Sequence, residues 1–348
     1  MKKFLYFLAA AAAATVSCTQ ETQQPEIPSE GVINISIEYG GTTTRAETAD
    51  TSSLEYETAI RKVDILVFND KGQLNRYFPA GTALNGIEFS VSTGEKDIWT
   101  VINGPDLSSV VRSADIKALK TYLKDNIRNG EGQGFVMAGH VSRKVMPSPS
   151  ENEITINVNR FATRVALKKL AVNLPSAYES VTIKNVMLTN VVANQNLEGT
   201  AAPEEWYNKK GRTEGDDIID GSSGREAECP DMTFKAVGTD VKNSGSLPLD
   251  TPWYFYGYPN PTAVDAVEAD DSFKEEQTRL VVTAEIEGRV YYYPVTLPTF
   301  NRNTAYEVEL TIEGMGTDDP DELPQKGIIQ ASVTIQPWEA GAIVTETI

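Results

Sequence analysis

Histidine and cysteine are scarce in this chain: His140 is its one histidine, and Cys18 and Cys229 are its two cysteines among 348 residues. A single histidine excludes metal sites built from several imidazoles, and only His140 remains to activate a serine or cysteine nucleophile. His140 lies in "VMAGHV", beside a turn-like glycine, which favours a structural role. Cys229 has no base beside it in sequence, so we expect an inert thiol. The sequence also lacks a phosphate loop, a dinucleotide fingerprint and a nucleophile elbow. We therefore expect neither catalysis nor a cofactor.

Positive charge is in short supply as well. The chain carries 49 acidic and 31 basic residues, a formal net charge of −18. Without Lys2 and Lys3 of the export segment described below, 29 basic residues remain and the net charge is −20. A surplus of this sign argues against a nucleic-acid partner and against electrostatic binding to an anionic membrane, and it favours a solvated surface.

Long apolar runs are rare too, and the one at the N-terminus indicates export. Lys2 and Lys3 precede an apolar stretch from Phe4 to Ala14, which is too short for a stable membrane span. We predict a signal peptide at residues 1–17 and a polar tether at 18–31. The pair Ser17-Cys18 resembles the lipobox of bacterial lipoproteins, in which the cysteine is lipidated, although Thr15 departs from that pattern. An ordinary secretory signal cut nearby is the alternative.

The stretch "INISIEYGGTTTRAETADTS" joins a strand pattern to a polar tether. Four apolar residues alternate with polar ones, which is typical of a half-buried strand: Ile33, Ile35, Ile37 and Tyr39. Two glycines end the strand, and Arg45-Ala46 follows in a polar segment, where a trypsin-type protease would cut. Arg45 is otherwise an ordinary loop arginine, as Arg128, Arg212 and Arg225 are.

The remaining pattern predicts an all-β protein made of two antiparallel β-sandwich domains, at 32–160 and 161–348, with one short helix in the first. The first domain includes a first strand over 32–45, and "VDILVFNDKGQLNRYF" reads as a hairpin. The helix is expected in "SADIKALKTYLKDNIRNG", whose Ile116, Leu119, Leu123 and Ile127 have helical spacing. One continuous strand in "EITINVNRFATRVALKKLAVNL" is expected to cross the domain boundary. Seven further strands are expected at 181–192, 232–237, 251–258, 279–287, 290–297, 305–313 and 328–335.

Two kinds of ligand site stay open from the residues alone. Calcium loops are conceivable in "GDDIIDGSS" and "GTDDPDELP", but the first has Ile218 at a ligand position of the EF-hand template, and solvated loops explain both. The aromatic runs "WYFYGYPNP" at 253–261 and "YYYP" at 291–294 suit a sugar-stacking platform. Alternation places about half of each run in the core, so these runs need no ligand to explain them.

Several features together resemble the fimbrillin family, the FimA-like major fimbrial subunits, which are lipoprotein pilins of the type V donor-strand class. They are the lipobox cysteine, "VDILVFNDKGQL", "NRFATRVALKKL" and the end "FNRNTAYEVELTIEGMG…ASVTIQPW". The resemblance implies transthyretin-like sandwiches and a precursor that is lipidated at Cys18 and held at the outer membrane. It further implies that an arginine-specific protease cuts at Arg45-Ala46, and that the released first strand leaves a groove for a strand of another copy or of a related pilin. The function implied is that of an adhesive structural subunit of a cell-surface fimbrium.

The candidate donor lies in the C-terminal segment 327–348, where Ile329, Ala331, Val333 and Ile335 share one face of a strand. Which part of this segment is donated stays open. Loss of a first strand exposes pockets worth about 1.5 to 3 kcal/mol for each large apolar side chain, together with unpaired backbone groups. The alternative function is a surface glycan-binding lipoprotein, with Trp253, Tyr254, Tyr256 and Tyr258 as its platform.

Overall fold

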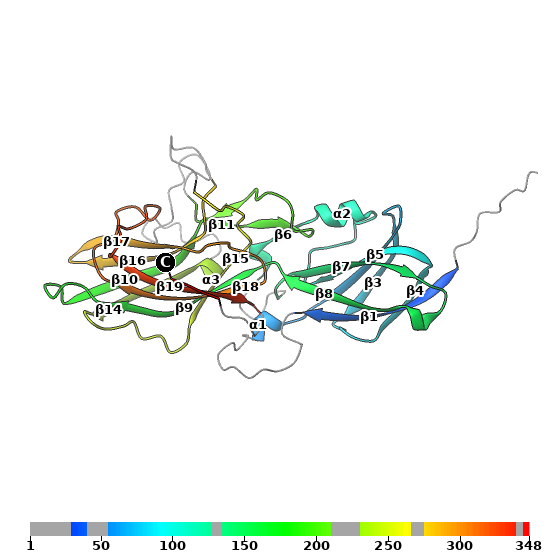
Figure 1. Cartoon of the computed structure of the whole chain (residues 1–348), viewed down its shortest axis with the longest axis horizontal. Helices are drawn as coiled ribbons and strands as arrows, with labels where there is room; N and C mark the ends of the chain where they lie inside the picture. Colours follow the sequence, from blue (N-terminus) through cyan, green and yellow to red (C-terminus); the bar gives the residue numbers. More distant parts are fainter. Residues whose placement is uncertain are drawn as a thin grey trace, which may run out of the picture.

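The computed structural model describes residues 29–39, 55–126, 134–209, 230–265, 275–338 and 344–347. The signal peptide, Cys18, the cleavage pair Arg45-Ala46 and Cys229 lie outside these residues. Two β-rich halves lie end to end along the long axis of the molecule (Figure 1). Among the described residues, no helix is both long and apolar enough to cross a membrane.

The first sandwich is built from one seven-stranded sheet in the order β3-β2-β5-β7-β8-β1-β4. β7 and β8 pair only at Met137 and Ala138, so the sheet has two nearly separate parts. Apolar side chains of both parts form one core, which includes Ile35, Ile65 and Ile98. The strands are β1 (Glu30–Tyr39), β2 (Val63–Asn69), β3 (Leu74–Gly81), β4 (Ile87–Ser92), β5 (Gly94–Ile102), β7 (Met137–Val145) and β8 (Glu153–Arg160).

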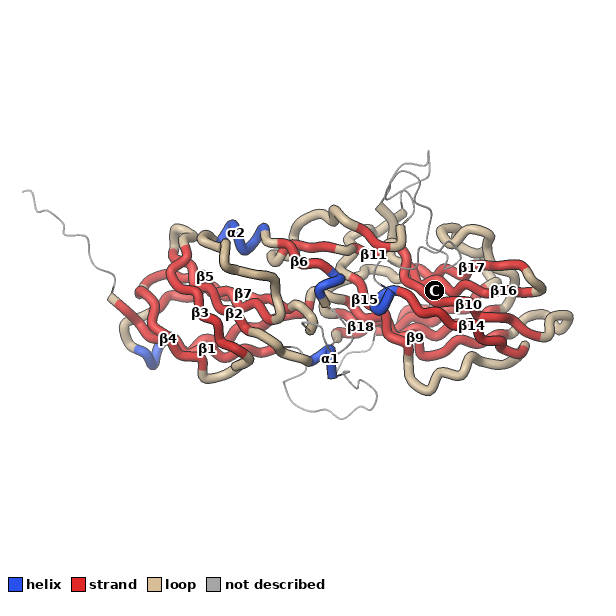
Figure 2. Tube along the Cα trace, turned by 180° about the vertical axis from the view of Figure 1, so that it is seen from behind, coloured by secondary structure: helices blue, strands red, loops and turns tan. Residues whose placement is uncertain are grey.

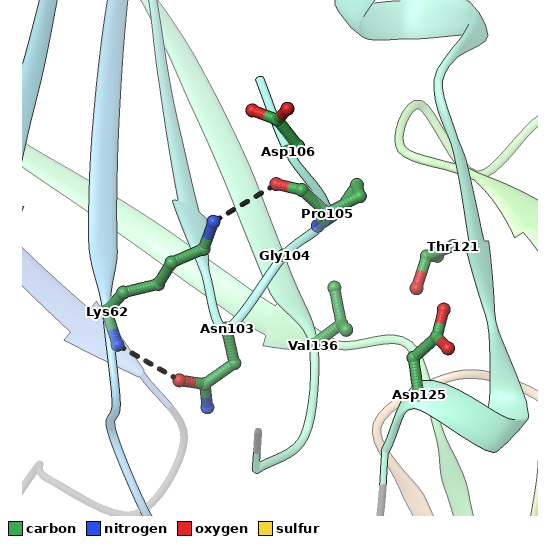
Figure 3. A pocket seen from close by; sticks show the side chains of 8 residues that line it. All are labelled: Lys62, Asn103, Gly104, Pro105, Asp106, Thr121, Asp125 and Val136. Atoms are coloured by element: carbon green, nitrogen blue, oxygen red, sulfur yellow. Dashed lines mark hydrogen bonds between the residues drawn. The ribbon is translucent and has the colours of Figure 1, made fainter. Parts of the chain in front are cut away.

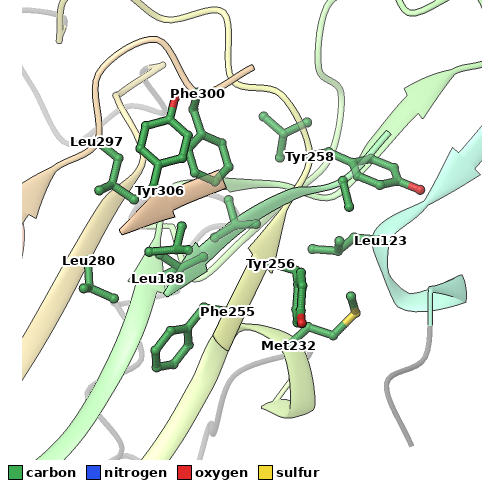
Figure 4. Close-up of a cluster of buried hydrophobic side chains, with 14 of the residues drawn as sticks. Leu123, Leu188, Met232, Phe255, Tyr256, Tyr258, Leu280, Leu297, Phe300 and Tyr306 are labelled. Carbon is green, nitrogen blue, oxygen red and sulfur yellow. The ribbon is translucent and has the colours of Figure 1, made fainter. Parts of the chain in front are cut away.

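The second sandwich packs a five-stranded sheet, β15-β9-β18-β19-β20, with a four-stranded sheet, β14-β10-β16-β17. Rings and aliphatic chains fill the space between them (Figure 4). The first sheet contains β9 (Thr163–Val172), β15 (Trp253–Gly257), β18 (Thr304–Ile312), β19 (Ile329–Pro337) and β20 (Val344–Thr347). The second contains β10 (Ser180–Thr189), β14 (Phe234–Lys242), β16 (Arg279–Ile286) and β17 (Arg289–Thr296).

Short elements connect these strands. The predicted hairpin forms as β2 and β3, with Gly72 at φ +70° in its turn. Besides the helix discussed next, the described residues include α1 (Glu55–Thr58), α3 (Pro230–Thr233), the 3₁₀ turns η1 (Leu123–Asp125) and η2 (Pro149–Glu151), and the short strands β6 (Lys120–Tyr122), β11 (Val191–Val192), β12 (Asn194–Asn196) and β13 (Trp206–Tyr207).

The predicted helix is much shorter than its sequence pattern. α2 covers Ser113–Ala118, and its backbone becomes extended at Leu119. Residues 120–122 instead form β6, which pairs with β12 of the second half. The apolar spacing of Ile116 and Leu123 is real, since both are fully buried, but they reach the core from a helix and from a 3₁₀ turn. Ile127 lies outside the described residues.

Two details of the sheets also differ from expectation. β1 pairs in parallel with β8, and β9 pairs in parallel with β18, so the sheets are not purely antiparallel. The single strand expected across the boundary is broken: β8 ends at Arg160 and β9 begins at Thr163. We call this junction the waist. The backbone N–H of Phe161 still donates to the carbonyl of Val136, one residue beyond the β7–β8 pairs, and from Thr163 the chain pairs with β15 and β18 of the second sandwich instead.

Candidate functional site

β1 lies in the interior of its sheet, with a partner strand on each side. It pairs in an antiparallel manner with β4, where Asn34 is opposite Glu88, and in parallel with β8, where Ser36 is opposite Thr155. Three of the predicted side chains, Ile33, Ile35 and Ile37, are at most 4% exposed in the core of the first sandwich. Of Tyr39 only the backbone is described, opposite Val158. We call the position of β1 between β4 and β8 the β1 slot.

A buried asparagine fixes the end of the β1 slot that is far from the waist. The side chain of Asn152 donates to the carbonyls of Val32 and Met146 at 2.9 and 2.8 Å, and its Oδ1 accepts from the N–H of Met146 at 2.9 Å. Its backbone carbonyl accepts from the N–H of Asn34 at 3.1 Å. Asn152 therefore bonds β1 directly to the turn that joins β7 and β8.

Glycine is required beside this asparagine. A Cβ atom on Gly31 would lie 2.4 Å from the backbone oxygen of Met146 and 2.9 Å from Cγ1 of Val145. Because a backbone oxygen cannot swing aside as a flexible side chain can, any strand that fills the slot needs glycine at this position.

The end of the β1 slot near the waist lies close to a buried ion pair. Glu57 of α1 is fully buried, and its carboxylate accepts from Nη1 of Arg164 at 2.9 Å and from the hydroxyl of Tyr256 at 2.7 Å. Nε of Arg160 donates to the backbone carbonyl of Glu57 at 3.2 Å. Burial, together with the nearby Glu57 carboxylate, raises the pKa of Tyr256 well above its ordinary value, so the hydroxyl stays a donor.

Trp338, the residue after β19, packs into the same network. Its ring stacks on Tyr256 with centroids 5.8 Å apart, and it meets Phe135 edge-on at 5.3 Å. The guanidinium carbons of Arg160 and Arg164 lie 5.0 and 5.5 Å from its ring centroid. Such cation–π contacts contribute about 0.5 to 2 kcal/mol. Glu57 of α1 and Trp338 at the end of β19 are thus held by one set of side chains at the waist.

The predicted donor residues lie within the second sandwich of their own subunit. β19 pairs with β18 over its full length, from Ile329 opposite Ile312 to Pro337 opposite Thr304. Val333 is fully buried and Ala331 is 7% exposed, while Ile329 and Ile335 are half-buried. Along its other edge β19 pairs with β20, through Ser332 to Ile335.

The aromatic run does not form the surface platform that a glycan site needs. Tyr256 and Tyr258 are fully buried, and burial raises the pKa of the Tyr258 hydroxyl, which is hydrogen-bonded to Thr121. Only Trp253 and Tyr254 are half-buried, and Nζ of Lys235 lies 4.8 Å from the ring centroid of Trp253. These rings belong mainly to the core or form hydrogen bonds and cation–π contacts.

The acidic loop at 316–324 is held by arginines. Asp318 accepts from Arg289 at 2.8 Å, and Asp321 forms an ion pair with the buried Arg279 at 3.3 Å. Burial raises the pKa of the Asp321 carboxyl to about 7, with Glu276 as a further cause. Across the part of the chain that the structure describes, no group of three or more potential metal ligands is arranged to hold an ion. The other candidate calcium loop, "GDDIIDGSS", lies outside the described residues.

A pocket of about 580 Å³ lies where the segment after β5 crosses toward the second half (Figure 3). Nζ of Lys62 donates to the carbonyl of Pro105 at its rim, at 3.1 Å. Two carboxylates face the same space, and burial raises the pKa of Asp125. The Thr121 hydroxyl is bonded to Tyr258 at 2.8 Å. The lining is Lys62, Asn103, Gly104, Pro105, Asp106, Thr121, Asp125 and Val136.

His140 has the structural role expected for it. Its ring stacks on Trp99 with centroids 4.5 Å apart, and its Nδ1 lies 3.0 Å from Oδ1 of Asp97. Sequence reasoning missed Asn152 and Glu57, each a polar residue in a polar stretch before or after a strand. Neither stretch signals that its polar residue is buried, because that depends on contacts with segments far away in sequence.

Comparison with known proteins agrees with this architecture. The family model of the major fimbrial subunit protein (FimA) matches residues 32–224, more than half of the chain. The chain belongs to this family. As a FimA-family member it is a fimbrial subunit, and the match begins within β1 and extends into the second sandwich.

Solved structures share the fold of this FimA-family subunit at low sequence identity. A fimbrilin (FimA) from Porphyromonas gingivalis W83 aligns with a TM-score of 0.61 and 16% identity, covering 88% of this chain and 97% of that chain. A candidate cell adhesion protein from Bacteroides eggerthii DSM 20697 aligns with a TM-score of 0.60 and 17% identity, covering 90% and 97%. The C-terminally truncated tip fimbrial protein Mfa3 from Porphyromonas gingivalis gives 0.50 and 14%, covering 88% and 100%.

Proposed function

We propose that this fimbrial subunit polymerises by protease-triggered donor-strand exchange and forms an adhesive, non-catalytic filament. The precursor is exported through residues 1–17, lipidated at Cys18 and held at the outer membrane by the tether 18–31. An arginine-specific protease cuts between Arg45 and Ala46 and frees the strand segment 32–45 from the sandwich 32–160. The sandwich 161–348 of another copy then supplies a strand from its segment 327–348.

The observation that carries this proposal is the placement of β1. β1 is paired along both edges, and Ile33, Ile35 and Ile37 point into the core, yet the segment that follows it contains Arg45. A cut there separates a complete strand from the chain. Its loss leaves two unpaired backbone edges and vacated apolar pockets, which favour uptake of another strand. In the intact precursor β1 fills the slot, so we expect a monomer.

Donor and acceptor lie on different parts of one subunit. The slot belongs to the first sandwich, whereas Ile329, Ala331, Val333 and Ile335 belong to β19 of the second. Such a contact is heterologous and open, so each added copy offers a new donor and a filament grows. β19 must leave β18 to be donated, and it regains pairing on both edges in the slot.

The test uses purified precursor without its lipid. We expect treatment with an arginine-specific protease to give a new N-terminus at Ala46, followed by an SDS-resistant ladder and filaments visible by electron microscopy. Arg45→Ala should prevent both. As matched controls, Arg128→Ala, Arg212→Ala and Arg225→Ala remove other arginines predicted to lie in loops and should change neither result. Clean cleavage at Arg45 that yields only monomers would contradict polymerisation by this route.

A further inference from the structure

The tight position at Gly31 restricts how a replacement strand can enter the slot. Only glycine fits there, because the Met146 carbonyl lies 2.4 Å from where a Cβ would be. The segment 327–348 contains two glycines, Gly327 and Gly341. The slot therefore allows two registers for a strand that runs in the direction of β1.

The Gly327 register reproduces the whole pattern of β1. Residues 31–39 read "GVINISIEY" and residues 327–335 read "GIIQASVTI". In this register Ile329, Ala331 and Val333 replace the inward residues Ile33, Ile35 and Ile37, and Ile335 takes the backbone position of Tyr39. Gln330 replaces Asn34, whose amide lies 3.4 Å from both Glu88 and Glu153, and Ser332 replaces Ser36.

The Gly341 register fits poorly. It places Thr345 and Thr347 in the pockets of Ile35 and Ile37, both at most 4% exposed. It also turns Val344 outward, to the position of Asn34. This register would bury the hydroxyls of Thr345 and Thr347 without hydrogen-bond partners, which is unfavourable. It would also expose the aliphatic side chain of Val344 to solvent, which is unfavourable as well.

The ends of the two strands favour the same direction. β1 begins at the end of the first sandwich farthest from the waist and ends near the waist (Figures 1 and 2). Gly31 lies near its start, against Val145 and Met146, and its last residue, Tyr39, is opposite Val158, two residues before β8 ends. β19 starts at Ile329 opposite Ile312, far from the waist, and ends beside Asn303. The end of the second sandwich far from the waist can therefore meet the corresponding end of the next subunit's first sandwich. In that arrangement residues 327–335 run directly from one sandwich into the β1 slot of the other.

From these observations we propose that residues 327–335 of one copy enter the β1 slot of the next in register with residues 31–39, with Gly327 at the tight position beside Asn152. This inference rests on the proposed function. In the monomer Gly327 has φ +91° in the turn before β19, so one glycine serves two conformations. For that reason the test leaves Gly327 unchanged.

The register is measured by disulfide cross-linking of filaments. Ser36 of β1 is opposite Thr155 of β8, so the proposed register places Ser332 opposite Thr155 of the next copy. In a Cys229→Ser background without the export segment, Thr155→Cys with Ser332→Cys should give a covalent ladder after cleavage and oxidation with diamide. Adjacent strand positions have the Cα separation that a disulfide needs. Glu88→Cys with Gln330→Cys reports the same register on the β4 side.

Two control pairs report the alternatives. Thr155→Cys with Thr334→Cys is shifted by two residues on the same face, and Thr155→Cys with Glu346→Cys reports the Gly341 register. Loss of the covalent ladder in both controls supports the proposal. A covalent ladder in either control, without one for Ser332→Cys, overturns the register but leaves strand exchange intact. Absence of even the non-covalent SDS-resistant ladder from every cleaved variant rejects strand exchange, and the register with it.

Discussion

At the residue scale, a few buried polar groups fix both ends of the acceptor strand. Asn152 is 2% exposed and bonds β1 to the β7–β8 turn, and Glu57 is fully buried beside Arg164. Buried polar groups of this kind contribute little net stability when paired, but they are expensive to leave unpaired. Their value lies in fixing one arrangement of the chain ends.

Asn152→Ala should destabilise the precursor by about 2–4 kcal/mol, because it removes the side-chain partner of the part-buried Met146 N–H and of the Val32 carbonyl. Urea unfolding monitored by tryptophan fluorescence measures this change. Asn157→Ala, at an exposed position of β8, is the matched control and should shift the free energy of unfolding by no more than about 0.5 kcal/mol. Equal effects of the two substitutions would contradict an anchoring role for Asn152.

Glu57→Gln should cost about 3–5 kcal/mol, since it leaves the Arg164 guanidinium buried without a counter-charge. Exposed Glu153→Gln serves as the control. Urea titration measures the free energy of unfolding of both variants. A loss below about 1 kcal/mol for Glu57→Gln would mean that the Glu57–Arg164 ion pair is not needed for stability.

Asp321 gives the protein a pH dependence of known sign. Its folded pKa of about 7 exceeds the unfolded value of about 3.9, so the folded state binds more protons between these values. Stability from this group is therefore greatest below about pH 4 and declines as the pH rises toward about 7. Asp321→Asn should flatten that decline in thermal unfolding measured across this window, whereas Asp250→Asn, at an exposed position, should not.

At the element scale, residues 31–39 of β1 and residues 327–335 before and within β19 share the same alternation of apolar and polar residues, but their apolar side chains differ in volume. Ala331 takes the place of Ile35 in the proposed register, and Ile35 fills a pocket with no exposed surface. A buried isoleucine replaced by alanine typically leaves a deficit of about 2–5 kcal/mol. The filament interface is therefore expected to contain an unfilled pocket at this point.

Ala331→Ile should fill that pocket and raise the temperature at which the SDS-resistant ladder dissociates. In the monomer Ala331 of β19 is 7% exposed and packs in the core of the second sandwich. The larger isoleucine side chain should therefore lower the unfolding temperature of the uncleaved precursor. Opposite shifts in the two measurements are the expected result. Ser332→Ala, at an outward position, is the control, and a ladder weakened by Ala331→Ile would argue against this register.

At the scale of the whole molecule, subunits that meet end to end repel one another. After cleavage at Arg45, residues 46–348 carry 45 acidic and 28 basic residues, and this net charge of −17 opposes association at low ionic strength, where salt does not screen it. Ladder formation after cleavage should therefore accelerate severalfold between about 10 and 150 mM NaCl, where the Debye length falls from about 30 to about 8 Å. Cleavage itself must be followed in parallel by N-terminal sequencing, and sucrose at matched osmolality should not reproduce the acceleration.

The alternation of apolar residues determined the strands by itself. β1 and β18 follow directly from period-two runs, because each buries one face of the strand. β2 and β16 are buried on both faces, and their short apolar runs and flanking turn residues indicated them instead. The acceptor face of Ile33, Ile35 and Ile37 was readable for the same reason. The fimbrial family was indicated by the resemblance of four sequence features, including "VDILVFNDKGQL" and "NRFATRVALKKL", and not by the alternation itself.

Only the tertiary structure decided which strands became neighbours and where the pattern failed. The helix expected at 113–130 stops at Ala118 because pairing of β6 with β12 outweighs helical spacing. The parallel pairing of β1 with β8, the tight fit at Gly31 and the burial of Glu57 and Asn152 all depend on segments distant in sequence. The local sequence pattern specifies on which face of a strand a residue lies, because side chains alternate along the strand. Which other segments pack against that face depends on long-range contacts.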